Sequence, residues 1–222
     1  MNTRELKSHL YDQVARIGAA VASPKRLEIL ELLAQGEKSV ETLAREATID
    51  VRLASAHLRV LRTARLVDVR REGKSRVYRL GGAEVSALWV ALRSVAESRL
   101  AELQMAMSQL FSGPERLTLE SSRSLLEKVR AGEAVLIDVR PEPEFRTAHL
   151  PGARSVPLDE LEKRIKDLPD DKEIIAYCRG PFCIMSDAAV TLLTRHGLRA
   201  RKIAEGVAEW QAAGLPLDVA AA

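Results

Sequence analysis

Cysteine is scarce in this sequence, which has only Cys178 and Cys183 among its 222 residues. Two thiols are too few for a disulfide-stabilised scaffold and too few for a four-thiolate metal site, so each is expected to be either inert or reactive. Long apolar runs are also missing, since no uninterrupted stretch approaches the roughly 20 residues of a membrane-spanning helix. The first residues, MNTRELKS, have no apolar core of a signal peptide. We therefore expect a soluble, cytoplasmic protein with no membrane partner.

The length and the charge distribution indicate two domains with different partners. Domains cluster near roughly 100–150 residues, so 222 residues favour two of them. Residues 1–100 carry a net charge of +6, whereas residues 101–222 carry −3. Within residues 51–80 there are nine Lys and Arg against two acidic residues. Such a local excess of positive charge is expected to attract a polyanion.

The apolar periodicity of the first half predicts four helices. Apolar side chains recur every three or four positions over residues 6–22, which predicts the first helix. The second is expected to begin at Ser23-Pro24, with Ser23 as its N-cap, and to end at Gly36. Two shorter helices are predicted over residues 40–47 and 51–62, the latter capped by Asp50. Short helices in this order make a helix-turn-helix plausible.

A β-hairpin and a long helix are predicted to complete the first domain. Apolar residues alternate over residues 67–80 around a Glu72-Gly73 turn, which predicts a hairpin. A last helix, from about Ala83 to Phe111, carries more apolar surface than one small domain can cover, so a second copy of the chain is expected to pack on it. Ser112-Gly113-Pro114 breaks this helix. The predicted parts are a DNA-binding and dimerisation domain at 1–111, a linker at 112–117 and a second domain at 118–222.

Beyond the linker the sequence alternates between strands and helices. Buried strands are predicted over residues 135–139 and 173–177, and helices over 158–168, 185–196 and 207–213. The predicted fold is therefore a mainly α winged helix-turn-helix domain, with helices and a β-hairpin wing, followed by a small α/β domain with a mostly parallel central sheet.

The helix predicted over residues 51–62 has the features of a recognition helix. Ala54, Leu58 and Leu61 form an inward apolar stripe, which leaves polar side chains outward to enter a major groove. The hairpin tip, which includes Arg70, is suited to phosphates. The candidate DNA-binding residues are Arg52, Ser55, His57, Arg59, Arg71, Lys74 and Arg76. A solvated basic face without a ligand is the alternative, but the helix order and the hairpin together favour double-stranded operator DNA.

Several segments of the first half resemble the winged-helix ArsR/SmtB repressors. The matching segments are SPKRLEIL at 23–30, SAHLRVL at 55–61, REGK at 71–74 and VYRL at 77–80. The resemblance implies a homodimer built from the first and last helices, which agrees with the surplus apolar face. Ser39 and Glu41 stand where thiolate metal sensors of that family carry cysteines, and the last helix has no His for a zinc site. No metal or cofactor is therefore expected.

Cys178 follows a predicted buried strand and precedes a helix expected to begin near Ile184. A loop that closes onto a helix N-terminus points backbone N–H groups inward and forms a nest for an anion. Such a nest favours thiolate over thiol, which makes Cys178 the candidate nucleophile and persulfide carrier, rather than an inert cysteine. The loop residues are Arg179, Gly180, Pro181, Phe182, Cys183 and Ile184. Cys183 is either a thiol that resolves an oxidised Cys178 or a passive loop residue.

The second half resembles the rhodanese domain. The matching segments, in order, are LIDVR at 136–140, EFRTAHLPGA at 144–153, CRG at 178–180 and GVAEW at 206–210. The resemblance implies that Cys178 takes a sulfane sulfur from a donor such as thiosulfate or a persulfide, and that Asp138 and Arg140 support the site. Ala148 departs from the Gly that the family commonly has. Rhodanese-like phosphatases carry an Arg six positions after the cysteine, where this chain has Ile184, which argues against phosphatase activity.

Two functions follow from these observations. The first is a homodimeric transcriptional regulator that carries sulfane sulfur as a Cys178 persulfide and senses reactive sulfur or redox state. The second is a thiosulfate or persulfide sulfurtransferase whose DNA-binding domain localises or regulates it. They differ in whether sulfur chemistry changes the affinity for DNA, so enzymatic activity is open at this point.

Overall fold

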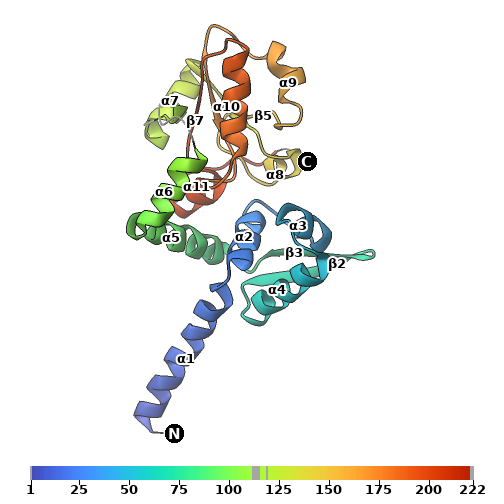
Figure 1. Cartoon of the computed structure of the whole chain (residues 1–222), viewed down its shortest axis with the longest axis vertical. Helices are drawn as coiled ribbons and strands as arrows, with labels where there is room; N and C mark the ends of the chain where they lie inside the picture. Colours follow the sequence, from blue (N-terminus) through green and yellow to red (C-terminus); the bar gives the residue numbers. More distant parts are fainter. Residues whose placement is uncertain (1, 112–115, 119, 221–222) are drawn as a thin grey trace. The chain divides into compact units, whose positions relative to one another are not determined.

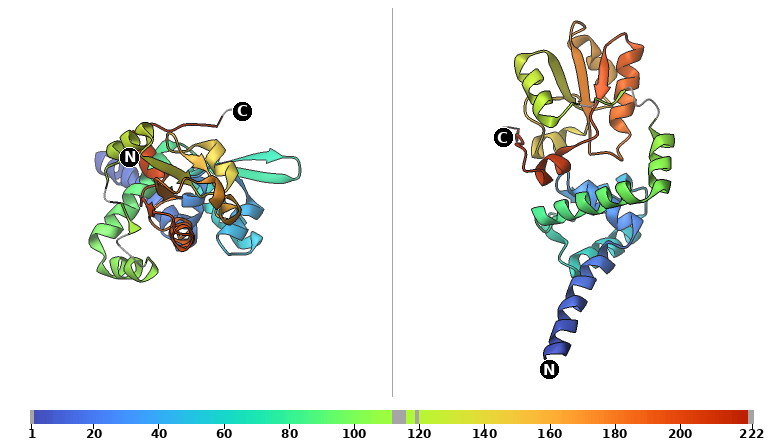
Figure 2. Two further views of the ribbon diagram at one scale, coloured as in Figure 1. Left: turned by 90° about the horizontal axis from the view of Figure 1, so that it is seen from above. Right: turned by 90° about the vertical axis from the view of Figure 1, so that its left-hand side faces the viewer.

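The structure, a computed structural model, describes residues 2–111, 116–118 and 120–220, which form two compact units (Figures 1 and 2). The first unit is Met1–Trp89 and the second is Val90–Ala222. Ser112, Gly113 and Pro114, where the sequence predicts the break between domains, lie outside the described residues. The limits at 1–111 and 118–222 therefore stay a prediction. In the described part of the chain, no helix is both long and apolar enough to span a membrane.

Local capping sets where the helices of the first unit begin. The helices are α1 (Thr3–Val21), α2 (Pro24–Leu33), α3 (Val40–Glu46) and α4 (Val51–Thr63). The Asp50 side chain accepts a hydrogen bond from the Leu53 N–H, and Ser39 accepts one from the Thr42 N–H. Ser23 occupies the N-cap position of α2, as expected, but its side chain makes no capping hydrogen bond.

A small antiparallel sheet forms the wing. Its strands are β1 (Lys38–Ser39), β2 (Val67–Glu72) and β3 (Ser75–Leu80), in the order β1-β3-β2. Gly73 turns the hairpin with a φ of 59°, a conformation that glycine adopts without strain. The predicted hairpin is confirmed. Strand β1 was not predicted, because two residues are too few to show an alternating pattern.

The core of the first unit lies where the short helices meet the wing sheet. Ala54, Leu58 and Leu61 are each 0% exposed, so the predicted inward stripe of α4 is confirmed. They pack in one cluster with Leu30 of α2 and Leu43 of α3. Helix α1 differs, because much of its apolar stripe faces outward. Its exposed apolar residues are Leu6, Leu10, Tyr11 and Val14.

The long helix expected from Ala83 to Phe111 is interrupted, so that prediction is wrong in this respect. Helix α5 (Ala83–Arg99) ends before Leu100, whose φ of −107° and ψ of 104° are extended, and α6 (Ala101–Leu110) follows. The Gln104 side chain donates to the Glu97 carbonyl over 2.9 Å, which satisfies one backbone group that the break leaves without its helical partner. Neither Gly nor Pro marks this break in the sequence.

The second unit contains a parallel four-stranded sheet in the order β5-β4-β6-β7. Its strands are β4 (Ala134–Asp138), β5 (Arg154–Ser155), β6 (Glu173–Tyr177) and β7 (Ala200–Lys202). Its helices are α7 (Ser122–Ala131), α8 (Glu142–Thr147), α9 (Leu161–Arg164), α10 (Met185–Arg195) and α11 (Val207–Ala212). The helix expected over 158–168 is shorter, because α9 gives way to a 3-10 turn at Ile165–Asp167.

Helices cover both faces of the parallel sheet (Figure 1), and alternate residues of the central strands pack against helices on opposite faces. Ile137 of β4 lies in a cluster with residues of α9 and α10, whereas its neighbour Leu136 lies in a cluster with residues of α7 and α11. Both central strands are therefore buried on two faces, which explains their continuous apolar sequences. This arrangement holds the carboxyl ends of β4 and β6 side by side, and Cys178 directly follows β6.

Candidate cysteine site and DNA-binding surface

Cys178 is buried at the end of the central strand β6, and its sulfur is surrounded by hydrogen-bonding groups. Its Sγ lies 3.6 Å from the Cys183 carbonyl oxygen and 3.6 Å from Ser186 Oγ in the first turn of α10. Burial raises the pKa of the Cys178 thiol, but hydrogen bonds from the Cys183 and Ser186 side chains and from the Ser186 and Gly180 N–H groups outweigh this effect. The net result lowers the pKa from 9.0 to about 7.

The second thiol has the opposite character. The hydrogen bond to Cys178 raises the pKa of Cys183, and burial and the negative charge of Cys178 raise it further. When the pair loses its first proton, it therefore becomes one thiolate, on Cys178, held by one thiol, on Cys183. Within the loop, Gly180 and Cys183 contribute donors to Cys178, whereas the Ile184 side chain is exposed. The role of the loop in binding an anion stays a prediction.

Asp138 and Arg140 form a completely buried ion pair at the end of β4. The Arg140 Nη2 donates to Asp138 Oδ2 over 2.6 Å, and the Arg140 backbone N–H donates to Asp138 Oδ1 over 2.9 Å. Tyr177, the residue before Cys178, donates its hydroxyl to Asp138 Oδ2 over 2.6 Å. Arg140 also donates to the Ala148 carbonyl over 2.8 Å. This network ties the ends of β4 and β6 together and so positions the start of the Cys178 loop.

The Arg179 side chain is held by a carboxylate from another part of the domain. Its guanidinium donates to both carboxylate oxygens of Glu144 in α8, with distances of 2.6 Å to Oε1 and 3.1 Å to Oε2. Both side chains are largely buried. The pair anchors the first residue of the loop. Because Glu144 holds the Arg179 side chain, the hydrogen bonds to Cys178 come from backbone N–H groups and from the Cys183 and Ser186 side chains.

Close packing under the loop requires two glycines. A Cβ on Gly206 would lie 2.5 Å from the Cys178 carbonyl oxygen, so no larger residue fits there. Gly180 has a φ of 149°, and a Cβ there would lie 3.1 Å from Glu209 Oε2. Glu209 in turn accepts a hydrogen bond from the Gly206 N–H over 2.6 Å and one from Arg93 Nη1 over 2.8 Å. Arg93 also lies over the Phe182 ring, 5.7 Å from its centroid.

Arg93 thus connects α5 with the loop that carries Cys178. Its side chain is buried, and besides Glu209 it pairs with Glu97 one turn along α5, with 3.1 Å between Nε and Oε1. The pairing of Arg93 with Glu209 does not stand out in the sequence, because 116 positions separate the two partners. Ser186, in contrast, lies in the first turn of the helix after the loop, where a donor to the sulfur could have been expected.

The basic residues of the first unit lie on α4 and the wing. Arg52 and Arg59 are exposed on α4, while Ser55 and His57 are partly buried there. Burial lowers the pKa of His57, and the positive charges of Arg26 and Lys25 lower it further, which favours the neutral form of the imidazole. It is therefore suited to a polar contact rather than to pairing with phosphate.

The wing concentrates positive charge that has few acidic partners. Arg71 and Arg76 face each other directly across the hairpin, an arrangement that like charges disfavour in the absence of an anion. Arg70 differs from them, because it pairs with Glu37 and Glu72. A hollow of about 490 Å³ beside the wing is lined by Arg62, Val69, Arg70, Arg71, Lys74, Ser75 and Arg76.

In the described residues, no group of three or more His, Cys, Asp or Glu side chains could hold a metal ion.

Comparison with known proteins assigns both halves of the chain. The family model for a rhodanese-like domain matches residues 121–213, and the model for bacterial regulatory proteins of the arsR family matches residues 23–69. The HTH-type transcriptional regulator Rv0324 of Mycobacterium tuberculosis is 41% identical over 212 residues, which are 96% of this chain and 93% of that protein. The chain is an ArsR-family transcriptional regulator with a C-terminal rhodanese domain. This agrees with both resemblances and with the predicted fold class.

Two further matches each cover one half of this ArsR-family regulator. A sulfurtransferase of Allochromatium vinosum is 27% identical over 97 residues, which are 43% of this chain and 90% of that protein. The solution structure of the homodimeric winged helix-turn-helix DNA-binding domain Mb0332 from Mycobacterium bovis is 43% identical, with a TM-score of 0.42, and covers 45% of this chain and 91% of that chain.

Proposed function

We propose that this ArsR-family regulator acts in the cytoplasm, binds operator DNA as a homodimer, and responds to sulfane sulfur carried on Cys178. The environment of Cys178 is the observation that carries this proposal. A pKa of about 7 leaves about half of the molecules with a Cys178 thiolate at neutral pH. A thiolate is the reactive form of cysteine, and fixed donors around it also stabilise the persulfide anion that replaces it.

The chemistry begins when a donor delivers one sulfur atom. With thiosulfate, Cys178 Sγ bonds to the outer sulfur, the S–S bond of thiosulfate breaks, and sulfite leaves with the electron pair of that bond. The product is the Cys178 persulfide anion, which carries the negative charge that the thiolate had. The donors of Ser186 and of the Gly180 N–H group surround the position where this charge remains.

Cys183 provides a second step. After loss of its proton, its sulfur attacks Cys178 Sγ of the persulfide, a Cys178–Cys183 disulfide forms, and the terminal sulfur leaves as hydrosulfide with that proton. The two side chains already share a hydrogen bond, so only a local movement of the loop is needed. Cys183 is thus assigned the resolving role in this proposal.

The exposed apolar residues support the dimer. Leu6, Leu10 and Val14 of α1 and Val95 of α5 are all exposed in the single chain. Apolar stripes of this kind are found where another protein surface packs, and a second copy is the simplest partner. A homodimer would present two α4 helices and two wings to successive turns of DNA.

The signal is proposed to pass through α5. Arg93 of this helix contacts Phe182 and the carboxylate of Glu209 under the Cys178 loop, and the same helix contributes Val85 and Trp89 to the first unit. An added sulfur atom at the buried Cys178 requires the loop to move, which changes the packing around Arg93. A coupling of about 1–3 kcal/mol between the two sites would change operator affinity several-fold.

Intact-mass spectrometry after treatment with thiosulfate or inorganic polysulfide tests the sulfur chemistry. The parent protein should gain the mass of one sulfur atom and then lose it as the Cys178–Cys183 disulfide forms. Cys178→Ser should gain none, and Cys183→Ser should retain the adduct because its hydroxyl cannot resolve it. An equal adduct on Cys178→Ser would overturn the assignment of the carrier.

A sulfurtransferase is the second candidate function. It is favoured by the buried, preorganised Cys178 site and by the similarity of this half to the Allochromatium vinosum sulfurtransferase. Repeated turnover of thiosulfate with a thiol acceptor, together with operator affinity that is independent of sulfur loading, would favour this function over sensing.

A further inference from the structure

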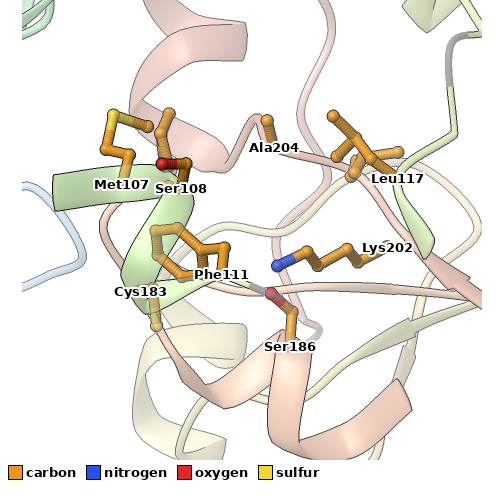
Figure 3. Close-up of a pocket in the computed structure, with 11 residues that line it drawn as sticks. Met107, Ser108, Phe111, Leu117, Cys183, Ser186, Lys202 and Ala204 are labelled. Carbon is orange, nitrogen blue, oxygen red and sulfur yellow. The ribbon is translucent and has the colours of Figure 1, made fainter. Parts of the chain in front are cut away.

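An apolar pocket lies beside the Cys178 loop, within the second unit. Its volume is about 350 Å³, near the lower end of the roughly 300–1,000 Å³ that small-molecule pockets occupy. Figure 3 shows Phe111 and Cys183 on one side of the pocket and Leu117 and Lys202 on the other. The described residues that line it are Met107, Ser108, Phe111, Leu117, Gly180, Pro181, Cys183, Ser186, Lys202, Ile203 and Ala204.

The pocket shares part of its wall with the reactive cysteine. Gly180, Cys183 and Ser186 line the pocket, and the same three residues provide the hydrogen bonds to the Cys178 sulfur. A molecule in the pocket therefore lies against residues that contact the Cys178 sulfur, Cys183 among them. This position suits a molecule that reacts at sulfur.

The charges in the pocket select against an anionic ligand. Lys202 is the only cation among the described lining residues, and its Nζ is already paired with Asp187 Oδ1 at 2.8 Å. The ammonium also lies 4.4 Å from the centroid of the Phe111 ring. A doubly charged anion such as thiosulfate would lose its hydration here without gaining a free positive charge. The pocket thus fits a neutral, apolar group.

We propose that this pocket binds the organic group of an apolar alkyl persulfide, which donates its outer sulfur to Cys178. This inference rests on the proposed sulfur-carrier function and names its substrate class. The donor enters in its protonated form: Cys178 Sγ bonds to the outer sulfur, the S–S bond of the donor breaks, and the alkyl thiolate leaves with the electron pair of that bond. The leaving alkyl thiolate takes the proton of the new Cys178 persulfide, so the products are the persulfide anion and a neutral alkyl thiol in the pocket.

The test compares donors of different length on the whole protein. Rate constants for addition of sulfur to Cys178 are measured by intact mass with methyl, butyl and hexyl persulfide and with thiosulfate. Each methylene that enters the pocket should raise the rate constant up to about fourfold until the pocket is full. Equal rate constants for the three alkyl donors, with normal modification of Cys178, would overturn the pocket assignment and leave the sulfur-carrier function standing. Failure of every donor would overturn the function itself.

Variants of α6 and of its C-cap residue Phe111 make the test specific. Phe111→Ala should lower the ratio of the hexyl to the methyl rate constant by about tenfold, because it removes an aromatic wall of the pocket. Met107→Ala should lower the same ratio by a smaller factor. Leu110→Ala, an exposed apolar residue of the same helix that does not line the pocket, is the matched control and should leave the ratio unchanged. An unchanged ratio in both pocket variants would contradict the proposal.

Discussion

The hydrogen bond between the two thiols should determine how reactive Cys178 is at neutral pH. In the structure the Cys183 side chain is the strongest of the donors that lower the pKa of Cys178, and the net pKa is about 7. Replacing Cys183 with alanine removes this donor and leaves the burial of Cys178 in place. The pKa of Cys178 should therefore rise in Cys183→Ala.

The size of the effect follows from the strength of such a bond. A hydrogen bond to a charged group contributes about 1.5–3 kcal/mol, which corresponds to roughly one to two pKa units. The thiolate fraction of Cys178 at pH 7 should then fall from about one-half to about one-tenth or less. The parent protein should show about tenfold more thiolate at pH 8 than at pH 6, because its pKa is about 7.

The pKa of Cys178 can be measured directly from the ultraviolet absorbance of the thiolate as a function of pH. Cys178 is the only cysteine in both Cys183 variants, and in the parent the pKa of Cys183 is raised out of the relevant range. Cys183→Ser is the control, because its hydroxyl still donates and should keep the midpoint close to that of the parent. A midpoint near pH 7 in Cys183→Ala would refute the role given to this hydrogen bond.

Three further predictions concern DNA, stability and coupling. Arg52→Ala and Arg59→Ala should each weaken operator binding by roughly 1–3 kcal/mol in titrations. The wing variants should weaken binding to all DNA sequences, and each should reduce the slope of log affinity against log salt concentration by about one unit; these variants are Arg71→Ala, Lys74→Ala and Arg76→Ala. Unchanged slopes would exclude the wing from contact with DNA phosphates. Asp138→Asn should lower the free energy of unfolding by about 3–5 kcal/mol in urea, because it leaves Arg140 buried with a neutral partner. As a control, Arg146→Gln removes one member of an exposed ion pair and should lower it by less than about 1 kcal/mol. Arg93→Ala should reduce any effect of persulfidation on operator affinity without preventing the adduct on Cys178, and an undiminished effect would exclude this route.

Patterns within one element were predictable from the sequence. The α4 stripe of Ala54, Leu58 and Leu61 follows from its spacing, and the Cys178 loop follows from a buried strand that precedes a helix. Very short elements such as β1 were missed because they contain too few residues for a period to appear. The end of α5 before Leu100 was missed because no helix-breaking residue marks it.

Contacts between distant segments could not be predicted in the same way. Glu144 and Arg179 are 35 positions apart, and only the parallel sheet brings α8 next to the Cys178 loop. The same holds for Tyr177, whose partner Asp138 lies on the neighbouring strand. A charge pattern in one sequence does not say which of many carboxylates and guanidinium groups will pair, because that choice depends on how the elements pack.

Operator DNA titration with reduced and persulfidated protein tests the central claim most directly. The account predicts that the two isotherms of the parent differ several-fold in affinity, and that Cys178→Ser treated with the same donor binds as the untreated variant does. Identical isotherms for reduced and persulfidated parent protein, with the adduct on Cys178 verified by mass in the same samples, would contradict the sensor function.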